Sequence, residues 1–238
     1  MRVLKPMVNN LAGAVAFDVM NGIDSQGGAC NFVANLDGTG AVLSPTASTW
    51  LQAGALLDVN SAPRSDRKIV MDPYTQARTV ATLAGLFNPS KEISSQYKSG
   101  EMMSALGFDW FMDQTVIKHT TASYSGTLTV NGAGQTGTTL VTNAITGGFA
   151  AGDIIAIAGV NNVNRITKQG TGQLKQFVIT SAAATGATSL SIYPAITPAV
   201  AGQAVQYQTC DVSPANGATI TPATLSGSTY RKNFAYCP

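Results

Sequence analysis

The sequence predicts an α+β fold in which a mixed helix-and-strand part is followed by a separate β-rich module. Residues up to about 120 hold most of the charged side chains, both tryptophans and apolar residues at helical spacing. From about residue 122 the pattern changes to short β-branched runs separated by glycine-rich turns. Because the residue pattern and the charge density change at the same place, we expect a domain boundary there.

The N-terminal residues predict an amphipathic helix over about residues 5–21, with Asn21 and Gly22 as its stop signal. Asn9 and Asp18 interrupt the apolar stretch, so the pattern of a secretory signal is not met. No apolar run reaches the roughly 18 residues of a transmembrane helix. The apolar positions of the predicted helix are Leu4, Met7, Val8, Leu11, Val15, Val19 and Met20.

A second helix is predicted over residues 46–60, with Trp50 on its apolar side and Pro63 beyond its end. Further along, residues 106–111 are apolar and aromatic. We expect this last segment to lie in a core or an interface.

Asp72 and Pro73 have the pattern of a helix N-cap followed by the first helical residue. A strand-like run over residues 67–71 leads into them, and the helix that they open is predicted to reach about Phe87. A short helix over residues 90–98 follows.

The second part of the chain predicts a small β-barrel or sandwich. Its short β-branched runs alternate with turn signals such as Asn131-Gly132 and Gly147-Gly148. The predicted strands cover residues 127–130, 138–142, 153–158, 176–180 and 189–193.

The composition excludes some classes of function. Only 11% of the residues are charged, against about 25% in an average domain, and the net charge is +2. A protein surface with so few charged residues is expected when much of that surface is buried against neighbouring molecules. Specific nucleic-acid binding would need clustered basic residues. The one dense basic group, Arg64, Arg67 and Lys68, is interrupted by Asp66, so a solvated loop is favoured over a phosphate site.

The three cysteines, Cys30, Cys210 and Cys237, are far apart in the sequence. They are typical of free buried thiols in a reducing compartment, and none of them has the CxxC spacing of a zinc site.

Two motifs resemble parts of active sites. Residues 132–137 match the GxGxxG pattern of dinucleotide-binding loops, but a strand-forming run follows where that fingerprint needs a helix. We therefore predict a β-turn or loop. His119 is the sole histidine, and no GxSxG elbow accompanies it. A hinge or interface role is favoured for it over that of a catalytic base.

The remaining carboxylates do not predict catalysis or metal binding. Asp109 and Asp113 are four residues apart, a spacing that would pair them on one helical face, but glycosidase chemistry needs more than this pair. Solvated charges beside an apolar patch are the favoured interpretation. Asp72 is better explained as a helix cap than as a metal ligand. We predict no catalytic, cofactor-binding or metal-binding residues, no cofactor, and a protein that is not an enzyme.

Several segments in a fixed order resemble the major capsid proteins of tailed bacteriophages, in the branch typified by the coat protein of the short-tailed Salmonella phage. In the first part these are residues 64–74 (RSDRKIVMDPY), 85–90 (GLFNPS), 95–100 (SQYKSG) and 105–109 (ALGFD). In the second part, residues 149–161 (FAAGDIIAIAGVN), 173–180 (QLKQFVIT) and 189–194 (SLSIYP) resemble the β-barrel of that branch's insertion domain.

The resemblance implies the capsid fold shared by tailed phages and herpesviruses, in which a spine helix and peripheral and axial domains carry an inserted small antiparallel β-barrel. Residues 1–22 would form the spine helix, 23–121 the peripheral and axial shell domain, 122–208 the insertion domain, and 209–238 an incomplete return to the shell domain. The family's N-terminal arm and later shell strands have no counterpart here, so we expect a chain truncated at both ends. The Lys–Asn cross-linking of some relatives is not carried over.

The function implied is that of a coat protein that self-assembles, through pentamers and hexamers, into the icosahedral shell around phage DNA. Its implied partners are other copies of itself, a scaffolding protein, a portal and, without sequence specificity, the packaged DNA; no membrane is involved. It would be assembled in the bacterial cytoplasm and reside in the virion. A β-rich decoration or carbohydrate-binding module remains the alternative, although Phe149, Phe177 and Tyr193 are the only aromatics over residues 125–205. A hydrolase is disfavoured by the single histidine.

Overall fold

The computed structural model describes residue 33 and residues 44–83, 104–114, 116, 118–199 and 205–237. These residues belong to two compact units. Unit 1 contains the described residues from 44 to 118 and from 230 onward, and unit 2 contains residue 33 and His119–Thr229. The predicted spine helix at residues 1–22, the predicted helix at 90–98 and Cys30 lie outside the described residues.

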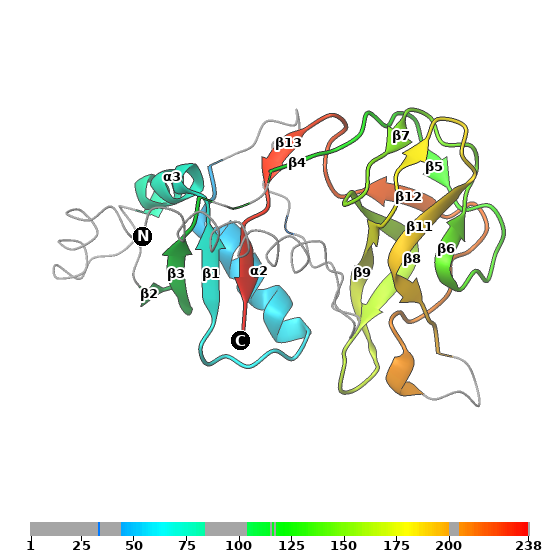
Figure 1. Cartoon of the computed structure of the whole chain (residues 1–238). Coiled ribbons are helices and arrows are strands. Elements are labelled where there is room, and N and C mark those ends of the chain that lie inside the picture. Colours follow the sequence, from blue (N-terminus) through cyan, green and yellow to red (C-terminus); the bar gives the residue numbers. More distant parts are fainter. Residues whose placement is uncertain are drawn as a thin grey trace, which may run out of the picture. The chain divides into compact units, whose positions relative to one another are not determined.

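Unit 1 contains helices and a small sheet (Figure 1). The helices are α2 (Ala47–Val59) and α3 (Pro73–Leu83). The sheet has the order β14-β1-β3-β2, with β1 parallel to β3 and antiparallel to β14. Its strands are β1 (Lys68–Met71), β2 (Ser104–Ala105), β3 (Phe108–Met112) and β14 (Phe234–Tyr236). This mixture of helices and sheet fits the predicted α+β class.

The helix predicted over residues 46–60 is confirmed as α2. At its start the Thr46 backbone N–H donates to the Thr49 hydroxyl at 3.4 Å, and at its end the Asn60 side-chain amide donates to the Leu56 carbonyl at 2.8 Å. The predicted strand and the helix after Asp72 are confirmed as β1 and as α3, which is described to Leu83.

The core of unit 1 lies between the helices and the sheet. The rings of Trp50 from α2 and Trp110 from β3 meet edge to face, with 5.0 Å between their centroids. The indole N–H of Trp110 donates to the Ala105 carbonyl at 2.8 Å. The buried apolar side chains are Trp50, Ile69, Met71, Leu83, Phe108 and Trp110, which confirms that residues 106–111 contribute to a core.

Unit 2 is built around an antiparallel six-stranded sheet in the order β5-β12-β8-β9-β11-β6 (Figure 1). Its strands are β5 (Leu128–Thr129), β6 (Gly137–Val141), β8 (Ile154–Val163), β9 (Gly170–Ile179), β11 (Ser189–Ile196) and β12 (Thr219–Pro222). The smaller elements are β7 (Gly148–Phe149), which pairs with β10 (Ala183–Ala184), and the 3-10 helix η1 (Val205–Tyr207). Where the chain passes between the units, β4 (Lys118–Thr120) and β13 (Thr229–Arg231) form a two-stranded sheet.

The two outer strands of the six-stranded sheet, β5 and β6, are joined just beyond their ends. Val130 and Thr142 form an antiparallel bridge there, and the Asn143 N–H donates to the Thr129 carbonyl at 2.9 Å. The outer strands thus carry backbone bonds to each other, and the unit has a core of buried apolar side chains. The most deeply buried of these are Leu140, Ile155, Ile157, Val160, Phe177, Ile179 and Cys210.

Unit 2 runs on to Thr229, past residue 208, where the predicted module ends. The reason is β12, which pairs with β5 on one side and β8 on the other. Its Ile220 is only 3% exposed and belongs to the same core as the earlier strands. Residues 209–229 therefore belong to unit 2, together with the strands of the predicted module.

Candidate functional site

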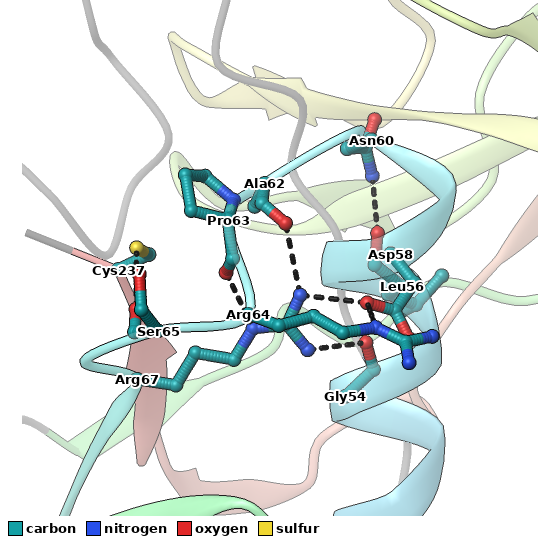
Figure 2. A network of polar contacts seen from close by, with 10 residues as sticks. All are labelled: Gly54, Leu56, Asp58, Asn60, Ala62, Pro63, Arg64, Ser65, Arg67 and Cys237. Atoms are coloured by element: carbon teal, nitrogen blue, oxygen red, sulfur yellow. Dashed lines mark hydrogen bonds and ion pairs between the residues drawn. The ribbon is translucent and has the colours of Figure 1, made fainter.

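A polar network in unit 1 is centred on the carboxylate of Asp58, in the last turn of α2 (Figure 2). The Arg64 guanidinium donates to both of its oxygens, at 3.2 and 3.1 Å. The Arg67 Nη2 donates to Asp58 Oδ1 at 2.7 Å. The hydrogen bond from Arg67, and next that from Arg64, hold the pKa of the Asp58 carboxyl below its ordinary value.

Arg67 also satisfies backbone carbonyls around this carboxylate (Figure 2). Its Nε donates to the Pro63 carbonyl at 2.8 Å and its Nη2 to the Ala62 carbonyl at 2.9 Å. Its Nη1 reaches the Gly54 carbonyl of α2 at 3.4 Å. A guanidinium with this many acceptors fixes the loop between α2 and β1 against the end of the helix.

The predicted solvated loop is therefore wrong for Arg67, whose side chain is 7% exposed. It holds for Arg64, which is 82% exposed, and Lys68 forms an ion pair with Asp66 at 3.2 Å. All three basic side chains are thus paired with carboxylates of unit 1.

Asp72 is confirmed as the N-cap of α3. Its carboxylate accepts from the N–H groups of Tyr74 at 3.0 Å and Thr75 at 3.3 Å, and also from the Thr75 hydroxyl. The Arg231 guanidinium lies 2.9 Å from Asp72 Oδ2 and 5.0 Å from the centroid of the Tyr74 ring. All of this explains the buried carboxylate without a metal ion.

His119 contacts a buried carboxylate in unit 2. Its Nε2 lies 2.8 Å from Asp153 Oδ1, and the Asp153 side chain is 2% exposed. The other carboxylate oxygen, Oδ2, accepts from the N–H groups of Ala150 at 2.8 Å and Ala122 at 3.4 Å. The carboxylate thus joins residues 119–122 to the turn before β8, and a structural role accounts for the pair.

The glycine motif at residues 132–137 forms a loop, as predicted, and strand β6 begins at its last residue, Gly137. The Gln135 side chain fills the loop: its amide nitrogen donates to the carbonyls of Asn131 and Val141, both at 2.9 Å. Its amide oxygen accepts from the Val141 N–H at 2.6 Å. The Gly132 N–H donates to Asn216 Oδ1 at 2.8 Å and the Gly134 N–H donates to the Pro214 carbonyl at 3.0 Å, so two backbone donors that could face a pyrophosphate are already paired.

Asp109 and Asp113 do not share a helical face, because Asp109 lies in strand β3 and Asp113 directly follows it. Residues four apart along a strand are separated by about 13 Å, which is too far for the paired carboxylates of a glycosidase. Both side chains are half-buried.

The described cysteines are free thiols. Cys210 is completely buried in the core of unit 2, and burial raises its pKa. Cys237 is half-buried and its thiol lies 3.4 Å from the Ser65 carbonyl (Figure 2). In the part of the chain that the structure describes, no cluster of His, Cys, Asp or Glu side chains could hold a metal ion. The helices described are too short or too polar to cross a membrane.

The sequence interpretation did not identify Asp58, Asp153 and Asp211 as carboxylates that bind other residues of the fold. Asp211 accepts from the Asn161 N–H at 2.7 Å and from its side-chain amide at 2.8 Å. Only Asp58 left a signal, because it lies near Arg64 and Arg67 in the sequence at a predicted helix end.

Comparisons with known proteins bear on the whole chain. A family model described as "P22 coat protein - gene protein 5" matches residues 1–236. Among solved structures, the "CUS-3 coat protein I-domain" is 30% identical to this chain and superposes with a TM-score of 0.33. The match covers 41% of this chain and 96% of the solved domain. None of the curated proteins matches the chain. The family match extends through both units.

Proposed function

Because the chain belongs to the P22 coat protein family, which makes it a structural protein of a phage capsid, we propose that it self-assembles into the icosahedral shell that encloses the phage DNA. The observation that carries this proposal is the extent of the family match, which covers residues 1–236. In this proposal the contacts between copies perform the function, and no pocket or catalytic group is needed.

The two units have different parts in the proposed assembly. We assign unit 1 to the peripheral and axial shell domain, and unit 2 to the insertion domain, folded as a small β-barrel. The bridge between Val130 and Thr142 supports the barrel, because it joins the two outer strands of the six-stranded sheet.

We further propose that the protein is not an enzyme. Among the described residues, several that a catalytic mechanism could use hold the fold instead: His119 contacts Asp153, Asp72 caps α3, and Asp58 pairs with two arginines. In the family context we expect a scaffolding protein and a portal as assembly partners, contact with packaged DNA without sequence specificity, and assembly in the bacterial cytoplasm.

Assembly of the purified protein together with the scaffolding protein of its own phage tests the proposal. Sedimentation velocity and negative-stain electron microscopy are expected to show shells, or rings of five and six subunits. A protein that stays monomeric with its scaffolding partner, over the concentration range in which coat proteins form shells, would contradict the proposed function.

A further inference from the structure

One end of unit 2 presents ordered apolar side chains to solvent. Ile166 lies in the turn between β8 and β9 and is 78% exposed. Tyr207 and Val205, in η1, are 73% and 51% exposed. We call these three residues the hairpin-end surface. Leu174 and Val212, on the same two segments, are also exposed.

The two segments that carry this surface are bonded side by side (Figure 1). At the turn, the Lys168 ammonium donates to the Gln206 carbonyl of η1 at 3.0 Å. Further along, Asn162 of β8 forms a bridge with Cys210, and the Asp211 carboxylate accepts from Asn161. The hairpin and the segment after η1 are thus held together over this whole length.

The turn itself is fixed by its own hydrogen bonds. The Asn164 side-chain oxygen accepts from the N–H groups of Ile166 at 2.9 Å and Thr167 at 3.0 Å. The Lys168 N–H donates to the Asn164 carbonyl at 2.9 Å, with Lys168 in the left-handed region at a φ of 58°. Ile166 is therefore presented on a loop of defined conformation, and little ordering is needed before it binds a partner.

Exposure of these apolar side chains to water is energetically unfavourable. Exposed apolar residues that gather on one part of a molecule mark interaction sites more often than scattered ones do. Of the other described residues of unit 2, only Val141 and Leu225 are large, apolar and comparably exposed, at 42% and 38%. The exposed apolar side chains of this unit are therefore concentrated at the hairpin end.

We propose that the hairpin-end surface is a contact between subunits, with a second copy of this chain as its occupant. The inference rests on the proposed function, because a coat protein meets other copies of itself over much of its surface. The low charge of the chain, 11% of its residues, agrees with a surface that is largely covered by neighbouring copies. Tyr207 and Ile166 provide the large side chains on which interface stability usually depends.

The test compares assembly of the full chain with that of the double variant Ile166→Glu, Tyr207→Ser. Since both side chains are exposed, the midpoint of thermal unfolding is expected to stay within a few degrees of the wild type. The concentration at which shells form with the scaffolding protein is expected to rise at least tenfold, or shells are lost. The matched control is Val141→Glu, an exposed position of the same unit away from this surface, which is expected to assemble as the wild type does.

A second measurement does not depend on a variant that disrupts assembly. In the variant Ile166→Cys, the new thiol is expected to react with a maleimide in the free subunit and to be protected in shells. Equal reactivity in both states, or normal assembly of the double variant, would overturn the inference while leaving the proposed function intact. Failure of the wild type to assemble would instead contradict the proposed function. Normal shells of the double variant with weakened DNA retention would assign the surface to nucleic acid, and the inference would again be wrong.

Discussion

At the scale of single residues, the buried carboxylate of Asp153 depends on the groups that surround it. Its side chain is 2% exposed, and it accepts from two backbone N–H groups and contacts His119 Nε2. A buried carboxylate that loses a polar partner retains its desolvation cost, which makes the loss larger than the worth of the hydrogen bond alone.

Replacement of His119 by Ala is therefore expected to destabilise the protein by about 1–3 kcal/mol. Urea unfolding monitored by circular dichroism measures the change. Lys118→Ala is the matched control, since Lys118 is the exposed neighbour of His119 in β4. Equal free energies of unfolding for the wild type and His119→Ala would show that water replaces the imidazole without cost.

Asp58 provides a pH-dependent contribution. The arginines Arg67 and Arg64 lower its pKa in the folded state below the ordinary value of 3.8. A carboxylate whose pKa is lowered by folding stabilises the protein above its unfolded-state pKa, and this contribution is lost as the pH falls through the folded-state value.

The variant Asp58→Asn is thus expected to be less stable than the wild type at pH 7. The difference in the free energy of unfolding should begin to shrink near pH 4 and continue to shrink as the pH falls further. Unfolding at a series of pH values for both proteins measures this difference, in which the contributions of the other carboxylates cancel. A difference that is independent of pH would exclude the ion pairs as its source.

At the scale of elements, α3 begins at a carboxylate that has two functions. Asp72 accepts from the free N–H groups of the first turn, and it pairs with Arg231, which lies far away in the sequence. The same side chain thus starts the helix and ties the C-terminal segment of unit 1 to it.

Asp72→Ala is expected to cost more than the roughly 0.5–2 kcal/mol of an ordinary N-cap, because it also leaves Arg231 without its carboxylate. Asp72→Asn keeps a capping oxygen and removes only the charge, so it should cost less. Thermal unfolding of both variants separates the contribution of the N-cap from that of the ion pair with Arg231. If Asn and Ala were equally destabilising, the cap would contribute nothing beyond the ion pair.

At the scale of the whole molecule, the two units are built differently in sequence. The described residues of unit 2 are residue 33 and the stretch His119–Thr229, whereas those of unit 1 come from before and after that stretch. Within the six-stranded sheet of unit 2, β12 lies between β5 and β8, and it is the strand of this sheet that comes last in the sequence. A fragment without β12 would leave two strands of the sheet without their neighbour.

The fragment 119–229 is therefore expected to fold by itself, and the fragment 122–208 is expected not to. The shorter fragment lacks β12 and its buried Ile220, and also His119, which contacts Asp153. Dispersion of the amide signals in proton–nitrogen NMR spectra distinguishes the two outcomes. A folded spectrum for 122–208 would show that β12 is dispensable for the sheet.

The sequence by itself determined the local elements that have strong signals. Periodic apolar residues predicted α2, the Asp72-Pro73 step predicted the start of α3, and alternation with glycine-rich turns predicted the β-rich unit. It also predicted that the glycine motif is a β-turn or loop, because a strand-forming run follows it. The ordered motifs predicted the coat protein family, which the family match confirms.

Only the tertiary structure decided which residues act together. Asp72 with Arg231, His119 with Asp153, and the two segments of the hairpin-end surface are pairs of groups that no spacing rule connects. The same holds for the end of unit 2, because β12 is a short strand whose place in the sheet depends on long-range pairing with β5 and β8. Local patterns report the period of a helix or strand, whereas long-range contacts depend on the packing of the whole chain, so the sequence predicted the elements and the structure decided their partners.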